Sequence, residues 1–331
     1  MTPVEIGDAL IEAGERRDLD LFVSRLPSGA PITMPVTIVH GVEPGPGLWL
    51  TAATHGDEVS GTEVIRQLLG RLDPGALSGV VIAAPIVNVH GFAESERYLP
   101  DRRDLNRSFP GSSRGSLASR MANLVMSNVV AHGKYGIDLH TGSDHRTNLP
   151  QIRADLDDPE THALAVAFGA PVMIHARLRD GSLRAAASSA GGAVLLYEGG
   201  EALRYDDWAI DAAVDGIWRA MAHLGMIEGD GRTSDTPLES RETSWVRAPG
   251  SGLMRRRTQL GDRVVQGEVL GTLGDALGRN ERPVKARTPG LVIGHTVRPV
   301  VYRGDAVFHL AEVAPTGEHP AANGSREPGR L

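Results

Sequence analysis

Apolar runs and polar turns alternate along the chain in the order strand, turn, helix. Residues 47–54 are almost continuously apolar, which is typical of a strand buried on both faces. A polar turn follows, and then apolar positions at helical spacing from Val64 to Leu72. Further strands are predicted at 80–87, 136–140, 171–175 and 193–197, and helices at 117–130, 159–168 and 208–224. This repeated alternation predicts an α/β fold with a mixed, mostly parallel sheet flanked by helices.

Changes in composition predict how the chain is divided. Two β-branched segments, 19–26 and 32–40, flank a Pro- and Gly-containing turn and predict a β-hairpin near the N-terminus. Gly, Asp, Ser and Thr dominate residues 230–243, which is typical of a linker. We therefore expect an α/β domain over 1–229, a linker over 230–243, an all-β domain over 244–313 and a disordered polar tail over 314–331.

The all-β segment contains two similar stretches, 248–254 and 287–293, which suggest internal pseudo-symmetry. Residues 260–271 resemble the barrel-sandwich domains of biotinyl and lipoyl carriers. However, the Met-Lys hairpin that bears the modified lysine in those carriers has no counterpart, and Lys285 stands in a different context. We expect this segment to be a lid or an oligomerisation element, which leaves a homo-oligomer open.

Composition excludes several classes of function. The 331 residues include no cysteine, which removes disulfides, thiolate metal ligands and a cysteine nucleophile. The formal net charge is -7, and the short basic run at 255–257 is too small for a nucleic-acid partner. Residues 1–25 lack the apolar core of a signal sequence, and no stretch approaches the about 18 apolar residues of a membrane helix. We therefore expect a cytoplasmic protein without a membrane partner.

A candidate metal site begins directly after the first buried strand. His55 and Glu58 lie three residues apart on a tight turn, so both side chains can reach one ion. His140, in a second strand ending, supplies a third ligand and leaves one coordination position for water, as in catalytic zinc sites. Two nitrogens and one carboxylate favour Zn²⁺, one per chain, although ligand type alone leaves manganese, cobalt and iron open.

Other polar residues are candidates for substrate binding and proton transfer. Asn106 and Arg107 combine a planar amide with a bidentate cation, which suits a substrate carboxylate. Arg184, in a segment expected to be a loop, is a further candidate for carboxylate binding. Glu198 follows an apolar strand and precedes two glycines, and it is the candidate general base.

Four motifs in series resemble the succinylglutamate desuccinylase/aspartoacylase family, whose fold is that of zinc carboxypeptidases. They are Thr54-His-Gly-Asp-Glu-Val-Ser-Gly61, Arg103-Asp-Leu-Asn-Arg-Ser-Phe-Pro-Gly111, Asp138-Leu-His-Thr-Gly142 and Glu198-Gly-Gly200. The match extends over roughly residues 30–225. The resemblance implies zinc on His55, Glu58 and His140.

The same resemblance implies roles for residues outside the ligand set. It implies substrate contacts from Asn106 and Arg107, and Glu198 as general base. Asp104 is implied to orient His55 and raise its basicity, and we assign Asp138 a similar supporting role. Arg97 lies where the family often places another substrate arginine, with Arg103 as a rival.

Together these features predict a zinc-dependent amidohydrolase that acts on a small N-acyl amino acid or a related compound. In this mechanism zinc-activated water attacks the amide and Glu198 takes the proton. Two alternatives stay open at this point. One is a metallocarboxypeptidase acting on small peptides, and the other is a non-catalytic small-molecule-binding member of the same fold.

Overall fold

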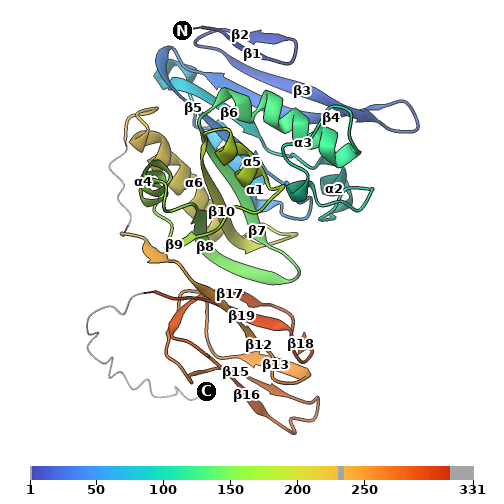
Figure 1. Cartoon of the computed structure of the whole chain (residues 1–331), viewed down its shortest axis with the longest axis vertical. Helices are drawn as coiled ribbons and strands as arrows, with labels where there is room; N and C mark the ends of the chain where they lie inside the picture. The colour runs from blue at the N-terminus through green and yellow to red at the C-terminus, as the bar shows by residue number, and fades with distance from the viewer. Residues whose placement is uncertain (1, 230–234, 314–331) are drawn as a thin grey trace, which may run out of the picture.

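The computed structural model describes residues 2–229 and 235–313. The expected tail at 314–331 and residues 230–234 of the expected linker lie outside the described residues. An α/β part occupies the upper half of Figure 1, and antiparallel C-terminal strands lie below it. This arrangement confirms the predicted fold class, a mixed, mostly parallel sheet flanked by helices with a smaller C-terminal β part.

Most strands of the α/β part belong to one large sheet. They are β3 (Arg16–Arg25), β4 (Pro31–His40), β5 (Glu43–Ala52), β6 (Ser78–Ala84), β7 (Tyr135–Gly142), β8 (Arg146–Ala154), β9 (Val172–His175) and β10 (Ala193–Glu201). The central strands β6, β5, β7 and β10 are neighbours in that order and run parallel. Leu48, Trp49 and Leu50 of β5 are fully buried, as expected for a strand covered on both faces.

Helices cover both faces of this sheet. Helices α1 (Ser60–Leu69), α4 (Pro159–Phe168) and α6 (Asp207–His223) share one hydrophobic core with one face, and α3 (Leu117–Asn128) and α5 (Leu183–Ser189) share another core with the opposite face. Short helical segments complete the part: α2 (Val89–Glu94), η1 (Pro74–Ala76), η2 (Leu105–Arg107) and η3 (Val130–His132). Parallel strands of such a layered fold end at a common edge, where ligands bind.

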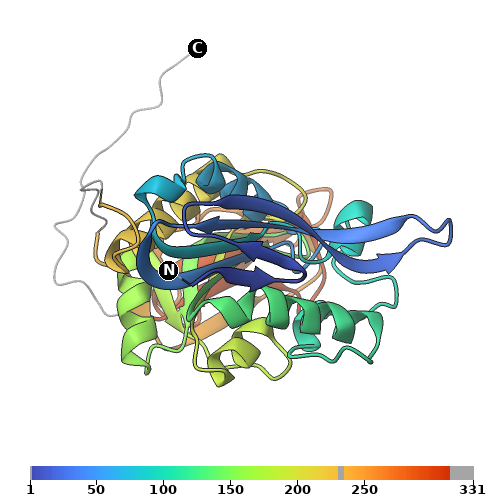
Figure 2. The ribbon, with the colours of Figure 1, turned by 90° about the horizontal axis from the view of Figure 1, so that it is seen from above.

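The N-terminal strands lie at the far end of the molecule from the C-terminal part. Strands β3 and β4 pair antiparallel, and Figure 2 shows their hairpin projecting beyond the helices. Strands β1 (Val4–Ile6) and β2 (Ala9–Ile11) form a separate small sheet beside them. Within residues 2–229 and 235–313, no helix combines the length and the apolar character needed to cross a membrane.

The C-terminal strands belong to two sheets, and all of them except β11 pair antiparallel. They are β11 (Leu238–Ser240), β12 (Thr243–Arg247), β13 (Gly252–Arg256), β14 (Arg263–Val264), β15 (Val269–Gly274), β16 (Arg282–Lys285), β17 (Gly290–Thr296), β18 (Val300–Val301) and β19 (Ala306–Ala311). Strand β17 pairs with β8, so the large sheet continues from the α/β part into the C-terminal part. The order across this junction is β12-β19-β17-β8-β10.

The sequence pattern does not predict three of the elements. These elements lie near the junction between the α/β part and the C-terminal strands. Strand β8 contains Pro150 and several polar residues, which hide its strand pattern. Helix α5 consists mainly of Ala and Ser and has no apolar stripe to announce it. Strand β11 lies within the segment expected to be a linker and pairs parallel with β9.

Candidate metal centre and active site

The turn that carries the first two candidate ligands is tightly constrained. Ala53, just after β5, has a φ of 49°, a left-handed value that turns the chain away from the strand. A Cβ on Gly56 would lie 2.0 Å from the backbone carbon of Gly91, so only glycine fits there. The turn therefore points His55 and Glu58 back toward the ends of the parallel strands before α1 begins.

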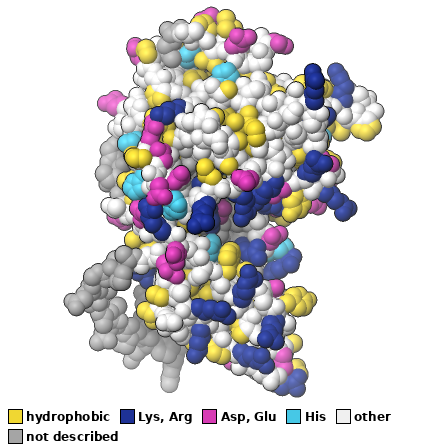
Figure 3. Space-filling view, in the orientation of Figure 1, with side chains coloured by type: hydrophobic (Ala, Val, Ile, Leu, Met, Phe, Trp, Pro, Cys, Tyr) yellow, Lys and Arg dark blue, Asp and Glu magenta, His cyan; other side chains and the backbone are white. Residues whose placement is uncertain are grey.

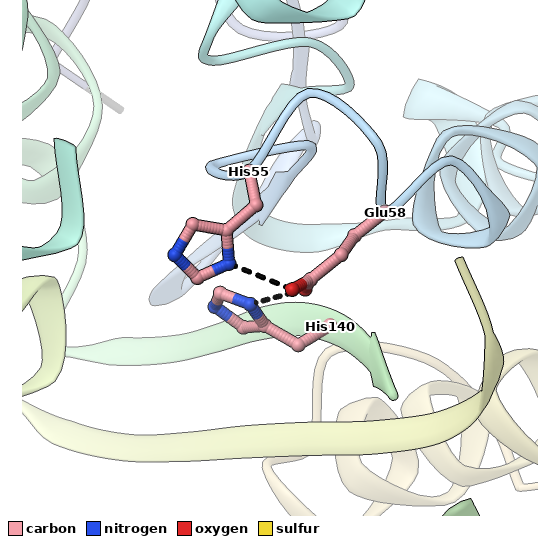
Figure 4. A group of neighbouring side chains, drawn as sticks. All are labelled: His55, Glu58 and His140. Carbon is pink, nitrogen blue, oxygen red and sulfur yellow. Dashed lines mark hydrogen bonds and ion pairs between the residues drawn. The ribbon is translucent and has the colours of Figure 1, made fainter. Parts of the chain in front are cut away.

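His55, Glu58 and His140 converge, although β7 brings His140 from 82 residues further along the chain than Glu58 (Figure 4). The Nδ1 atom of His55 lies 2.8 Å from Oε1 of Glu58, and the Nδ1 atom of His140 lies 2.7 Å from Oε2. All three residues are at least 95% buried. Candidate ligand atoms of the three residues lie within 4.8 Å of one another, so one ion can contact all of them.

A carboxylate lies behind each imidazole. Asp138 lies 2.7 Å from Nε2 of His140 and also accepts hydrogen bonds from Thr51 and Thr54. Asp104 lies 3.3 Å from Nε2 of His55 and accepts the backbone N–H of Asn106 at 2.9 Å. Carboxylates in this position orient a ligating histidine and leave its other nitrogen free for a metal.

The charges in this cluster oppose the effect of burial. Burial alone would lower the pKa values of His55 and His140, but Glu58 together with Asp104 or Asp138 raises both. Burial would likewise raise the pKa of Glu58, yet the two imidazoles hold it well below its usual value. The hydrogen bonds between the three residues need a proton on each Nδ1. A divalent cation can replace those two protons, so the donor set fits a divalent metal ion.

The segment from Arg97 to Arg107 borders the cluster. Arg97 donates to Glu58 at 3.0 Å and to Asp104 at 3.4 Å, and it lines the same cavity. Arg103 points away and bonds to Ser116, with its side chain 61% exposed. Of these rival arginines, the structure therefore brings Arg97 to the cluster.

Asn106 and Arg107 also line this cavity but are held differently. Asn106 is buried, and its Oδ1 accepts the backbone N–H of Leu183 at 2.9 Å, which joins the segment to the start of α5. Arg107 is exposed and donates to the backbone oxygen of Asn106. Burial and the nearby Arg179 and Arg97 outweigh Asp104 and lower the pKa of Arg107, and no described carboxylate bonds to its guanidinium.

Glu198 lies in the same cavity but inside a strand, whereas the sequence pattern ends that strand at Tyr197. Strand β10 continues to Glu201, and the pairing register shifts between Glu198 and Glu201. The Nδ2 atom of Asn148 donates to Oε2 of Glu198 at 2.8 Å, and Nε of Arg153 lies 3.3 Å from Oε1. Both oxygens are thus oriented by side chains of the neighbouring strand β8.

Arg184 does not lie in a loop, and that expectation is wrong. It occupies the first turn of α5, where the side chain of Ser182 caps the helix by accepting from Ala185. Its guanidinium donates to the backbone oxygens of Ala176 at 2.8 Å and Arg177 at 2.9 Å. Arg184 borders the cavity, but its guanidinium is engaged by these two hydrogen bonds, which hold the segment at Ala176 and Arg177 in place.

The cavity around these residues has a volume of about 450 Å³ and is rich in arginine. Its seven arginines are Arg97, Arg107, Arg146, Arg153, Arg177, Arg179 and Arg184. Trp245 and His309 of the C-terminal strands also line it, with their rings stacked at 4.2 Å. The sequence pattern did not identify Arg146, Asn148 and Arg153. The alternation of Arg146 and Asn148 with Thr147 and Leu149 was the signal that could have revealed β8.

A second group of metal-type side chains lies at the ends of β8 and β9. Asp155, Asp157 and His175 also offer ligand atoms within 4.8 Å of one another. However, the backbone N–H of Leu156 donates to Nδ1 of His175, and Arg241 pairs with Asp157 at 2.6 Å. The first group is buried and the second is partly exposed and already paired, so the first is the stronger candidate for a metal site.

Comparisons with known proteins agree with this fold. A curated N-alpha-acetyl-L-2,4-diaminobutyric acid deacetylase from Halomonas elongata is 29% identical over 306 residues, which is 85% of this chain and 86% of that protein. A crystal structure of a succinylglutamate desuccinylase/aspartoacylase from Rhodobacter sphaeroides is 29% identical, with a TM-score of 0.80, and covers 92% of this chain and 98% of its own. The product-bound ectoine utilization protein EutE (DoeB) from Ruegeria pomeroyi has a TM-score of 0.80 at 24% identity, covers 94% of this chain and 99% of its own, and supports the fold alone.

One family profile matches the part of the chain that contains the candidate site, apart from the residues that the C-terminal strands contribute to the cavity. Its description is the succinylglutamate desuccinylase/aspartoacylase catalytic domain, and it matches residues 44–224, more than half of the 331 residues. This chain belongs to the succinylglutamate desuccinylase/aspartoacylase family.

Proposed function

We propose that this protein is a zinc-dependent deacylase that hydrolyses the amide bond of a small N-acyl amino acid. The observation that carries the proposal is one cavity that contains three different groups. These are the His55, Glu58 and His140 cluster, the carboxylate of Glu198, and Arg107 without a carboxylate partner among the described residues. Hydrolysis of an N-acyl amino acid needs all three: a metal site, a base and a cation for the substrate carboxylate.

The two histidines and Glu58 would hold the metal, and Asp104 and Asp138 would keep the imidazoles in position. A bound zinc supplies Lewis acidity that makes water acidic near neutral pH and polarises a carbonyl group. Arg97 bonds to Glu58 and Asp104, and we propose that it steadies the ligand carboxylate as well as bordering the substrate.

Glu198 would accept the proton of the attacking water and then donate it to the leaving nitrogen. Asn148 and Arg153 orient its two oxygens, so the carboxylate does not need to rotate into place during the reaction. Arg107 and the amide of Asn106, which line the same cavity, would bind the substrate carboxylate.

The arginines of the cavity also indicate the charge of the substrate. Seven arginines and two ligand or catalytic glutamates line it, so its potential favours anions. The substrate named for the Halomonas elongata relative carries a second amine, and a cationic side chain would face these arginines. We therefore propose an N-acyl amino acid whose side chain is neutral or acidic.

Turnover of a panel of N-acyl amino acids by zinc-loaded protein tests the function. The panel should contain neutral, acidic and basic side chains, and both products should be measured. Equal release of free amino acid and carboxylic acid is expected for the neutral or acidic members. Release of the terminal residue from dipeptides instead would favour a metallocarboxypeptidase, and binding without turnover would favour a non-catalytic member.

Replacement of Arg107 by lysine is expected to raise KM by about tenfold or more, because an ammonium cannot form the bidentate pair of a guanidinium. The replacement keeps the charge, so zinc content should not change. Arg103→Lys is the matched control, since Arg103 bonds to Ser116 outside the cavity. Steady-state kinetics that leave Arg107→Lys fully active would remove Arg107 from the substrate site.

Zinc affinity is expected to decrease as the pH falls, because both histidines must lose a proton to become ligands. The pKa values of His55 and His140 are raised in the metal-free protein. Protons therefore compete with zinc for these imidazoles at pH values above those at which a histidine ordinarily titrates. The histidines are protonated below these values and available above them. Chelator competition between about pH 5 and 8 measures this, and a constant affinity would contradict the proposed ligand set.

A further inference from the structure

A second and larger cavity, of about 1000 Å³, lies on the other side of β8 from the catalytic cavity. Within residues 146–149, strand β8 supplies Thr147 and Leu149 to this cavity and Arg146 and Asn148 to the catalytic one, which Arg153 further along the strand also lines. Successive residues of a strand point to opposite faces, so β8 forms a wall shared by both cavities. The segment from Met254 to Leu260 and the end of β17 close the other sides.

This cavity, which we name the basic cleft, is strongly cationic. Its described lining contains Arg204, Arg255, Arg256, Arg257 and Arg298 together with His295, and no aspartate or glutamate. The whole chain has a net charge of -7, so such a cluster does not follow from composition. Figure 3 shows that Lys and Arg side chains gather over the C-terminal strands and their junction with the α/β part.

Most of these guanidinium groups have no anionic partner among the described residues. Arg204 pairs with Glu201 and Asp206. Arg256 contacts the ring of His295, and Arg298 contacts the ring of His145. Burial and Arg256 lower the pKa of His295 to about 4, so this ring is neutral near pH 7 and leaves the charge of Arg256 in place.

Arg255 and Arg257 are exposed, and their side chains form no hydrogen bond or ion pair with any residue in 2–229 or 235–313. Arg255 lies near the end of β13 and Arg257 directly follows this strand, and both side chains line the basic cleft. Four of the five arginines therefore form no ion pair with a described carboxylate, although Glu201 lies near enough to Arg256 to raise its pKa against the effect of burial. Mutual repulsion in such a cluster is relieved when a multivalent anion binds.

We propose that the basic cleft binds a small molecule that carries two or more linked phosphate groups. Guanidinium groups bind phosphate oxygens through paired hydrogen bonds, and several adjacent arginines favour several adjacent phosphates. Trp208 also lines the cleft and is 45% exposed, so its ring offers a face for an aromatic base. A nucleotide and an inorganic polyphosphate both carry linked phosphate groups, but only the nucleotide has a base that can stack on Trp208.

Calorimetric titration of the full-length, zinc-loaded protein with ATP and with tripolyphosphate tests this site. Both probes are expected to bind saturably, and the double variant Arg255→Ser/Arg257→Ser is expected to weaken binding by about tenfold or more. The matched control Arg114→Ser/Arg120→Ser removes the same charge from exposed positions on another surface and should bind like the wild type. Zinc content is measured for each variant, because both probes also bind metals.

The remaining measurements distinguish a nucleotide from an inorganic polyphosphate and include the results that would overturn the proposal. If Trp208→Leu weakens the binding of ATP but not that of tripolyphosphate, the cleft is a nucleotide site. If the replacement changes the affinity for both probes to the same extent, the ligand is a polyphosphate chain. The proposal is overturned if no probe saturates, if both double variants bind alike, or if the tricarboxylate tricarballylate binds as tightly. It is also overturned if the cleft variant changes the oligomeric state without any anion binding to the wild type, which would make the cleft an interface between copies.

Discussion

Glu198→Gln is expected to lower kcat by about 10²–10⁴-fold while zinc content and folding stay near those of the wild type. Glutamine keeps the size of the side chain and can still bond to Asn148, but it cannot accept a proton from water. Its amide also loses the charge that faces Arg153 at 3.3 Å. The effect is measured by stopped-flow or steady-state kinetics with an N-acyl amino acid that the wild type hydrolyses. The metal content of the same sample is determined as well.

Glu201→Gln is the matched control for this experiment. Glu201 lies three residues further along β10, and it pairs with Arg204 outside the catalytic cavity. It should therefore retain turnover within a few fold. If Glu198→Gln lost zinc, Glu198 would be a ligand or a structural support, and unchanged turnover would assign proton transfer to another group.

His55→Ala is expected to abolish stoichiometric zinc binding and with it the hydrolysis. The replacement removes one of three ligands and leaves the buried Glu58 beside a single imidazole. Protein purified without chelator should contain about one zinc per chain in the wild type and almost none in the variant. Elemental analysis measures this directly, independently of activity.

His175→Ala provides the comparison for the metal measurement. His175 belongs to the partly exposed Asp155, Asp157 and His175 group, which Arg241 and the backbone of Leu156 already engage. The variant should keep the zinc of the wild type. Loss of metal from His175→Ala, with metal retained by His55→Ala, would transfer the site to the second group and refute the proposed ligand set.

Several features of the site could be predicted because they depend on neighbours in the chain. His55 and Glu58 lie on one turn after a buried strand, so their spacing alone brings both side chains toward one point. His140 and Glu198 lie on apolar strands, and the parallel order of such strands places their ends at one edge. The order of the motifs was also enough to identify the family before any contact was known.

Other features arise from pairing between distant segments, which sequence periodicity does not report. Arg97 reaches Glu58 while Arg103 does not, because the fold of the segment between them turns one inward and the other toward α3. Asn148 and Arg153 reach Glu198 because β8 runs antiparallel beside β10. Pro150 obscures that strand in the sequence, so its two contributions were missed.

By itself, the sequence determined the α/β class, the likeness to one family and the residue types of the candidate metal site, since all three follow from local pattern and order. Only the tertiary structure decided which cations stay unpaired and what closes the catalytic cavity. Trp245 and His309 line that cavity because β17 pairs with β8 and brings the C-terminal strands next to it. Strand pairing of this kind depends on contacts about 100 residues or more apart, whose free energy comes from burial and hydrogen bonding in the assembled sheet.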